Sequence, residues 1–183
     1  MIMTAPTVAP TTVWNLDPTH SEVEFSAKHL MITTVRGRFS DVEGTVTVHG
    51  DAPESAVVDV TVKVASIDTR TEQRDQHLRS ADFFDVENFP VLTFTGTKLQ
   101  GPKARFQLTG NLTIRGTTKP ITLDVTHEGS GKDPWGGERM GFSADGKIDR
   151  RDFGLTWNQA LEAGGVVVSH DIKIHIDAQL VRA

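Results

Sequence analysis

Apolar and polar residues alternate along two segments in the middle of the chain, residues 106–114 and 121–125. A period of two places successive side chains on opposite faces of a β-strand, so each segment is predicted to be a strand with one apolar face. The connector between them, residues 115–120, contains Gly116 and Pro120. The pattern therefore predicts a β-hairpin with one buried face.

The same alternation recurs along most of the chain. It predicts further strands at residues 13–16, 23–29, 42–48, 58–64, 91–99, 140–148 and 166–180. Phe39 and Val42 are out of phase with each other, which suggests a β-bulge near Ser40. We count about eight strands and few helices, which is typical of an all-β protein.

Three segments interrupt the alternation. Residues 30–35 contain enough apolar residues for one helical turn. Thr69 with Glu72 fits a capping box, so a short helix is predicted from Thr69 to Arg79. Phenylalanines at 83, 84 and 89 follow it; they either gate a barrel mouth or anchor the insertion to the core. The glycine-rich residues 129–137 lack the spacing of a phosphate-binding motif and are predicted to be a hairpin loop.

Consecutive antiparallel strands with short glycine and proline turns favour a sandwich or an up-and-down barrel. Several predicted strands approach ten residues, and closing a long sheet removes its edges, so we expect an extended antiparallel eight-stranded barrel with one or two short helices. We expect residues 13–183 to form this domain and residues 1–12 to be a flexible N-terminal segment. Such a barrel holds either its own side chains or one small ligand, and the sequence leaves both open.

Composition narrows the choice of function. The chain has 183 residues, a net charge of -5 and no cysteine. No basic stripe is present, so neither a nucleic acid nor an anionic membrane surface is an expected partner. The lack of cysteine excludes disulfides, thiolate metal sites and a cysteine nucleophile. No apolar run suits stable membrane insertion or a signal peptide, so we expect a cytoplasmic protein.

Four stretches of the chain carry a family resemblance. They are residues 14–25 (WNLDPTHSEVEF), 28–31 with 35–39 (KHLM and VRGRF), 112–120 (LTIRGTTKP) and 144–154 (ADGKIDRRDFG). In their order and spacing the chain resembles the YceI-like family, whose domains bind lipids or polyisoprenoids.

The resemblance implies an extended, lipocalin-like barrel with an elongated cavity. The ligand it implies is an isoprenoid chain, a quinone tail or another long, fatty-type amphiphile, bound non-covalently and without a further cofactor. Many relatives resemble exported proteins with a signal peptide, and this sequence departs from them at its start.

Three histidines share the apolar phase of their strands: His29, His127 and His170. Each is either solvated at a strand end, in contact with a polar head group inside the cavity, or part of a metal cluster. No His-x-His or His-Glu-x-x-His spacing appears, so no metal site is predicted.

Arginines near strand ends suit a phosphate or pyrophosphate, and the candidates for such a contact are Arg36, Arg38, Arg150 and Arg151. Alternatively, residues 149–152 form a self-paired charge cluster that pins a turn. Asp149 and Asp152 are also a conceivable acid/base pair, but nothing places a nucleophile beside them, so no catalytic residue is predicted.

The residues expected to contact a ligand are mostly inward by alternation, although alternation alone cannot separate ligand contacts from core packing. They are Phe25, His29, Met31, Arg36, Phe39, Phe83, Phe84, Phe94, Phe106, Leu108, Leu112, Ile114, His127, Phe142, Ile148, Arg150, Phe153, Trp157, His170 and Ile172.

Three functions are compatible with the sequence. The favoured one is a non-enzymatic carrier that stores or transports one long isoprenoid lipid, isoprenyl phosphate or isoprenoid quinone. The second is a hydrolase or isomerase that acts on a prenyl-type lipid with His and Asp at the cavity mouth, and the third is an interaction module with a packed barrel. A homodimer is conceivable because Val57 and Val167 lie on otherwise polar faces.

Overall fold

The structure is a computed structural model that describes residues 10–183. This part of the chain has one α-helix, α1 (Glu72–Arg79), and three short 3-10 segments, at Pro53–Ser55, Val64–Ser66 and Arg150–Phe153. The strands are β1 (Thr11–Leu16), β2 (Glu22–His29), β3 (Thr33–Phe39), β4 (Val42–His49), β5 (Val57–Lys63), β6 (Ile67–Asp68), β7 (Val91–Gln100), β8 (Arg105–Ile114), β9 (Thr117–Lys132), β10 (Glu138–Asp149) and β11 (Asp171–Arg182).

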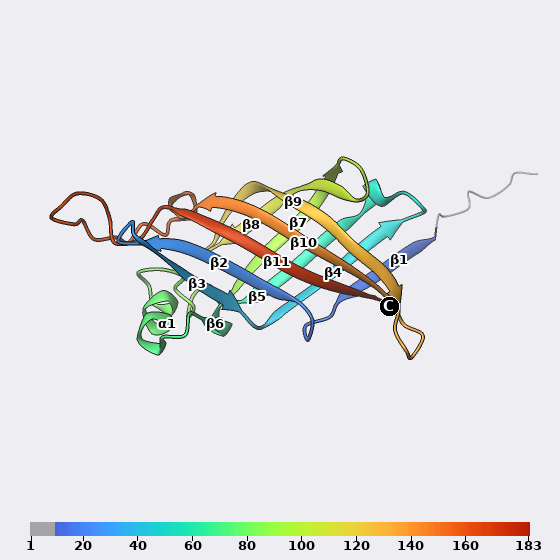
Figure 1. Ribbon diagram of the computed structural model, residues 1–183, viewed down its shortest axis with the longest axis horizontal. Coiled ribbons are helices and arrows are strands. Elements are labelled where there is room, and N and C mark those ends of the chain that lie inside the picture. The colour runs from blue at the N-terminus through green and yellow to red at the C-terminus, as the bar shows by residue number, and fades with distance from the viewer. Residues whose placement is uncertain (1–9) are drawn as a thin grey trace, which may run out of the picture.

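Eight of these strands form a closed antiparallel barrel. They pair in the order β1, β4, β5, β7, β8, β9, β10 and β11, and β11 pairs with β1 to close the ring. The predicted fold class is thereby confirmed. Figure 1 shows the barrel as an elongated body, with α1 and β6 at one end and the C-terminus at the other.

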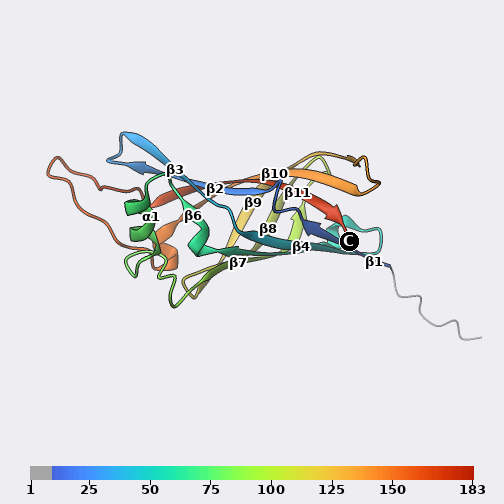
Figure 2. The ribbon, with the colours of Figure 1, turned by 90° about the horizontal axis from the view of Figure 1, so that it is seen from below.

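Strand β11 changes partner along its length. Leu180, Val181 and Arg182 pair with β1, whereas residues 173–177 pair with β2. Strand β3 then pairs with β2, and β6 with β3. The barrel is therefore closed by β1 at the end with the C-terminus and extended by β2, β3 and β6 at the end with α1 (Figure 2).

The inward faces of the strands form two clusters of buried residues. One lies toward α1, where Phe39, Ile67 and Phe153 pack together with Phe83 from the segment after the helix. The other contains Phe94, Leu108, Leu123, Val125 and Ala144. These side chains alternate with polar ones, as period-two strands require when one face is covered.

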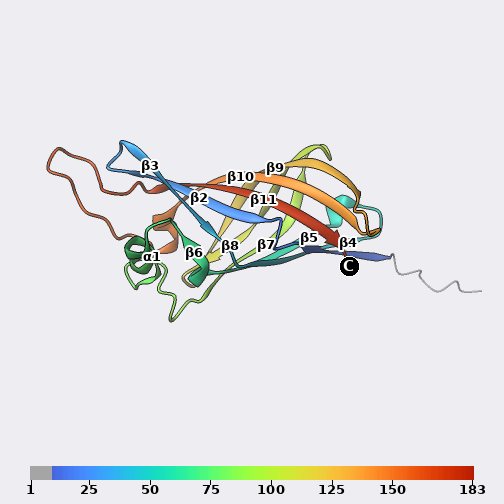
Figure 3. The ribbon, with the colours of Figure 1, turned by 60° about the horizontal axis from the view of Figure 1, so that its bottom comes forward.

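The predicted helical turn at residues 30–35 is wrong. Leu30 and Met31 have positive φ, 52° and 60°, and the Ile32 amide donates to the His29 carbonyl at 3.1 Å. The chain thus reverses in a tight hairpin and enters β3 at Thr33. The tip of this hairpin lies beside the loop before β11, because the Leu30 amide donates to the Val167 carbonyl (Figure 3).

The predicted bulge near Ser40 is also wrong. Phe39 pairs with Val23 at the end of β3, and Val42 pairs with Val62 at the start of β4. Both side chains are buried because they belong to different strands on either side of a corner. Register shifts occur instead between Gly96 and Lys98 and between Gly141 and Phe142.

Several elements begin or end at other residues than the sequence predicts. Helix α1 begins at Glu72 with Thr71 as N-cap residue, and no side chain caps it, so the capping box at Thr69 is wrong. The predicted hairpin loop at residues 129–137 is shorter in the structure, residues 133–137, because β9 runs to Lys132 and β10 starts at Glu138. Strand β11 begins at Asp171 rather than at residue 166.

At the N-terminus, β1 begins at Thr11, so residues 11 and 12 of the segment predicted to be flexible belong to the barrel. The first part of that segment, residues 1–9, lies outside the described residues.

Candidate functional site

Two adjoining cavities occupy the barrel interior. The cavity beside α1, the helix-end cavity, has a volume of about 350 Å³, and the cavity toward the C-terminus, the termini-end cavity, has about 650 Å³. Both volumes fall within the range of about 300–1,000 Å³ that is usual for ligand pockets. The residues that line both cavities are Val23, Val60, Phe94, Leu123 and Ile176. The two spaces therefore meet in the middle of the barrel.

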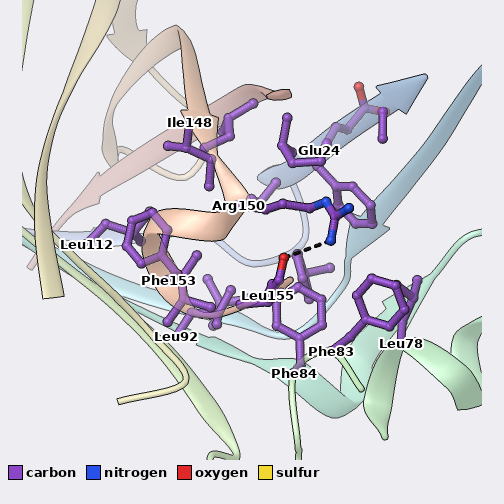
Figure 4. Close-up of a pocket in the computed structure, with 18 of the residues that line it drawn as sticks. Glu24, Leu78, Phe83, Phe84, Leu92, Leu112, Ile148, Arg150, Phe153 and Leu155 are labelled. Carbon is purple, nitrogen blue, oxygen red and sulfur yellow. Dashed lines mark hydrogen bonds between the residues drawn. The ribbon is translucent and has the colours of Figure 1, made fainter. Parts of the chain in front are cut away.

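Aromatic side chains close the helix-end cavity beside α1. The rings of Phe83 and Trp157 lie 5.3 Å apart, and the His77 ring meets them edge-on at 5.1 and 4.7 Å. Phe84 packs edge-on against Phe39, at 5.9 Å. Figure 4 shows Phe83, Phe84 and Phe153 around the cavity. Phe83 and Phe84 thus line the site and also attach the helical insertion to the core.

Arg150 is the buried cation of the helix-end cavity, with 4% of its surface exposed. Its guanidinium donates to the carbonyls of Leu155 at 2.7 Å, Trp157 at 2.8 Å and Ser169 at 2.9 Å, and it lies 5.9 Å from the Phe83 ring centre (Figure 4). Burial lowers the pKa of Arg150 from its ordinary value. Arg150 therefore holds residues 155–157 and Ser169 together.

The neighbouring charges form a separate pair. The Arg151 guanidinium donates to the Asp149 carboxylate at 2.5 Å, and these hydrogen bonds lower the pKa of Asp149 to about 2. Asp149 is thus held ionised, which makes it a poor proton donor. Asp152 is exposed and lines neither cavity. The self-paired cluster at residues 149–152 consists of Asp149 and Arg151.

The termini-end cavity is lined mainly by aromatic and aliphatic side chains. Phe142 is central there, since its ring lies 6.4 Å from that of Phe106 and 5.1 Å from that of His127. The Nε2 atom of His127 is buried and has no hydrogen-bond partner among residues 10–183.

Comparisons with known proteins agree with this architecture. A family model described as the YceI-like domain matches residues 14–180. The chain belongs to the YceI-like family. A curated relative, Protein YceI of Salmonella newport (strain SL254), is 44% identical over 137 residues, which cover 75% of this chain and 72% of the relative.

Solved YceI-like and related structures share the fold. The Campylobacter jejuni YCEI protein has a TM-score of 0.72 at 36% identity, and the match covers 84% of this chain and 88% of that one. Burkholderia cenocepacia BcnA has a TM-score of 0.77 at 21% identity, and the match covers 90% of this chain and 98% of BcnA. A polyisoprenoid binding domain from Saccharophagus degradans has a TM-score of 0.67 at 16% identity, and the match covers 97% of this chain and 100% of that domain.

Most of the residues predicted as ligand contacts line the cavities of this YceI-like barrel. In the helix-end cavity are Phe25, His29, Phe39, Phe83, Phe84, Phe94, Leu112, Ile114, Ile148, Arg150, Phe153, Trp157 and Ile172. In the termini-end cavity are Phe94, Phe106, Leu108, His127 and Phe142.

Three predicted contacts line neither cavity: Met31, Arg36 and His170. Met31 is 57% exposed at the tip of the β2–β3 hairpin, and Arg36 is exposed on the outer face of β3. The three histidines do not converge, and residues 10–183 contain no group of three or more His, Cys, Asp or Glu side chains that could hold a metal ion.

Other lining residues were not predicted. Val23, Val62, Ile174 and Ile176 share the inward phase of their strands, so the same alternation marks them. Leu155, by contrast, lies in an irregular segment that carries no periodic signal.

Among residues 10–183, no helix has the length and apolar character needed to span a membrane.

Proposed function

We propose that this YceI-like barrel encloses the hydrocarbon chain of one long isoprenoid-type lipid and shields it from water without chemical turnover. The observation that carries the proposal is the pair of adjoining apolar cavities inside a closed barrel. The related fold of the polyisoprenoid binding domain from Saccharophagus degradans supports the same ligand class.

The energetics favour a long chain. Burying a five-carbon isoprene unit from water contributes roughly 3–4 kcal/mol, at ~0.8 kcal/mol per CH₂. Transfer of the chain from a bilayer gains almost nothing, because one hydrocarbon environment replaces another. The shape of the cavities and the polar end of the lipid must therefore decide which lipid binds. We infer that the barrel stores or transports this lipid.

Binding without turnover is supported by the state of the polar side chains. Arg150 is bonded to backbone carbonyls, and the Thr69 hydroxyl donates to the Asp75 carboxylate at 2.5 Å. Of the His and Asp side chains considered for an enzyme, His29 lines the helix-end cavity and is exposed, whereas Asp152 is exposed and lines neither cavity. Among the residues in 10–183 that line the two cavities, no hydrogen-bonded set of acid, base and nucleophile favours the enzymatic alternative.

Native mass spectrometry of the purified protein tests the proposal. We expect one lipid per barrel, either carried through purification and recovered by solvent extraction, or taken up after incubation with geranylgeraniol or a prenylated quinone. A protein that carries no lipid and takes up neither compound would contradict it. The cytoplasmic location and the homodimer stay predictions. The homodimer was suggested by Val57 and Val167, and both of these side chains are half-buried.

A further inference from the structure

His127 has unused hydrogen-bonding capacity inside the termini-end cavity. It follows the buried residues Leu123 and Val125 on the inward face of β9, and it lines the cavity. Its Nε2 atom is buried without a partner among residues 10–183. A buried polar atom that lacks a hydrogen bond destabilises the empty protein, so a bound molecule that supplies the partner is favoured.

The backbone fixes the position of this histidine. The His127 amide donates to the Ala104 carbonyl at 3.0 Å, which ties β9 to the turn at residues 101–104. Gly101, Pro102 and Lys103 of that turn also line the cavity. A bulge follows immediately, where the register of β9 against β10 shifts at Gly141 and Phe142. Bulges of this kind commonly direct a side chain at a functional site.

His170 provides an internal comparison. Its Nδ1 atom is also buried without a partner in the described part of the chain, yet His170 lines neither cavity. A ligand inside the barrel can therefore complete the hydrogen bonding of His127 but does not reach His170.

The charges around the termini-end cavity disfavour an anionic partner. Three carboxylates line it, Glu22, Glu54 and Asp177, against one ammonium group, Lys103. Lys103 is exposed, so no buried cation offsets the loss of hydration that a phosphate would suffer there. Arg150, the buried cation of the barrel, lines the helix-end cavity instead.

We propose that His127 binds the uncharged polar end, a hydroxyl or a quinone carbonyl, of the lipid in the barrel. A neutral imidazole carries one donor and one acceptor nitrogen, so its tautomer can suit either group. The polar end then lies in the termini-end cavity, and the hydrocarbon chain extends past Val60 and Phe94 toward α1. This inference rests on the proposed function, because it requires a lipid inside the barrel.

The test compares phytol with phytane, the saturated hydrocarbon that has the same branched carbon skeleton and no hydroxyl group. Dissociation constants are measured by displacement of a fluorescent prenyl probe, and the ratio of the two constants is compared between proteins so that lipid solubility cancels. In His127→Phe we expect the preference for phytol to fall about tenfold relative to the unmodified protein, the change that one hydrogen bond supplies. His170→Phe should leave the ratio unchanged, and His127→Gln, which keeps a donor and an acceptor, should retain most of the preference.

The outcomes separate the inference from the proposed function. If both lipids bind and the ratio is the same in His127→Phe as in the unmodified protein, His127 does not bind the polar end, although the barrel still binds lipid. Tighter binding of phytyl phosphate than of phytol would contradict the proposal that the polar end of the lipid is uncharged. If the unmodified protein binds neither phytol nor phytane, the proposed function itself fails.

Discussion

Asp17 accepts a hydrogen bond from the Arg139 guanidinium at 2.8 Å, although 122 positions separate the two residues. The same carboxylate accepts hydrogen bonds from Thr19 and contacts His20 and Gln179. It thus joins the β1–β2 connection to β10 and β11, at the place where β11 changes partner from β1 to β2. The hydrogen bonds from Thr19 and His20, with that from Arg139, hold the pKa of Asp17 far below its ordinary value of 3.8.

This pKa predicts an acid-sensitive barrel. Because the folded-state pKa lies below the unfolded value, the ionised carboxylate stabilises the fold above about pH 4, and that contribution is lost as the pH falls toward the folded-state pKa. Asp17→Asn should lower the free energy of unfolding by about 1–2 kcal/mol at pH 7 and by less at pH 3. Urea denaturation at the two pH values measures this difference.

The control for Asp17 is Asp51→Asn, a carboxylate on the exposed loop between β4 and β5. It should unfold like the unmodified protein at both pH values. A gap between Asp17→Asn and the unmodified protein that stays constant from pH 7 to pH 3 would show that the stabilisation does not come from the ionised carboxylate.

Gly37 is required by the position of Phe25. A Cβ atom at Gly37 would collide with Cζ of Phe25, which lines the helix-end cavity, and would lie 2.7 Å from Cγ2 of Thr69. Gly37→Ala should therefore lower the free energy of unfolding by about 1–3 kcal/mol, as overpacking does in other cores. Gly131→Ala is the matched control in β9, because its Cβ would meet no atom within 4 Å.

A second substitution tests the cause of the Gly37 effect. Phe25→Leu in the Gly37→Ala background should recover part of the lost stability, since the smaller side chain makes room for the methyl group. Equal unfolding curves for Gly37→Ala and Gly131→Ala would contradict the steric explanation.

The alternation of residues predicted the barrel because each strand buries one face only. Val58, Val60 and Val62 face inward, and Asp59 and Thr61 do not line the interior. The prediction failed at residues 30–35, where three consecutive apolar residues carry no period. There, Leu30 and Met31 adopt a left-handed conformation that glycine usually supplies. Because neither position is a glycine, the sequence carried no signal for a turn.

The site was predictable in part for the same reason. Alternation identifies inward residues, but it does not tell at which end of the barrel they lie or how much space they leave. Phe153 is almost fully buried in the core, whereas Val60 lines both cavities, and alternation gives the two residues the same inward assignment. Met31 and Arg36 were misplaced because the hairpin that carries them projects beyond the barrel.

Arg150 should contribute to stability through its geometry as well as its charge. Arg150→Lys keeps the charge, but one ammonium group cannot reach the carbonyls of Leu155, Trp157 and Ser169 together. The carbonyls left without partners should lower the free energy of unfolding by about 2–3 kcal/mol. Arg151→Lys, at the exposed neighbour, should cost less than about 0.5 kcal/mol by the same urea denaturation. Similar costs for the two variants would argue that the carbonyl contacts of Arg150 add little.

A substitution at Val60 tests whether the two cavities act as one binding site. It lines both, so Val60→Trp should fill the junction between them. A short prenol such as geraniol should still bind, because one cavity is enough to hold it. A long one such as solanesol should bind at least about tenfold more weakly, since excluding even two CH₂ groups from the barrel removes ~1.6 kcal/mol of burial. Thr61→Trp, at a neighbouring position that lines neither cavity, controls for the added bulk. Unchanged binding of solanesol to a folded Val60→Trp variant would mean that the lipid occupies one cavity alone.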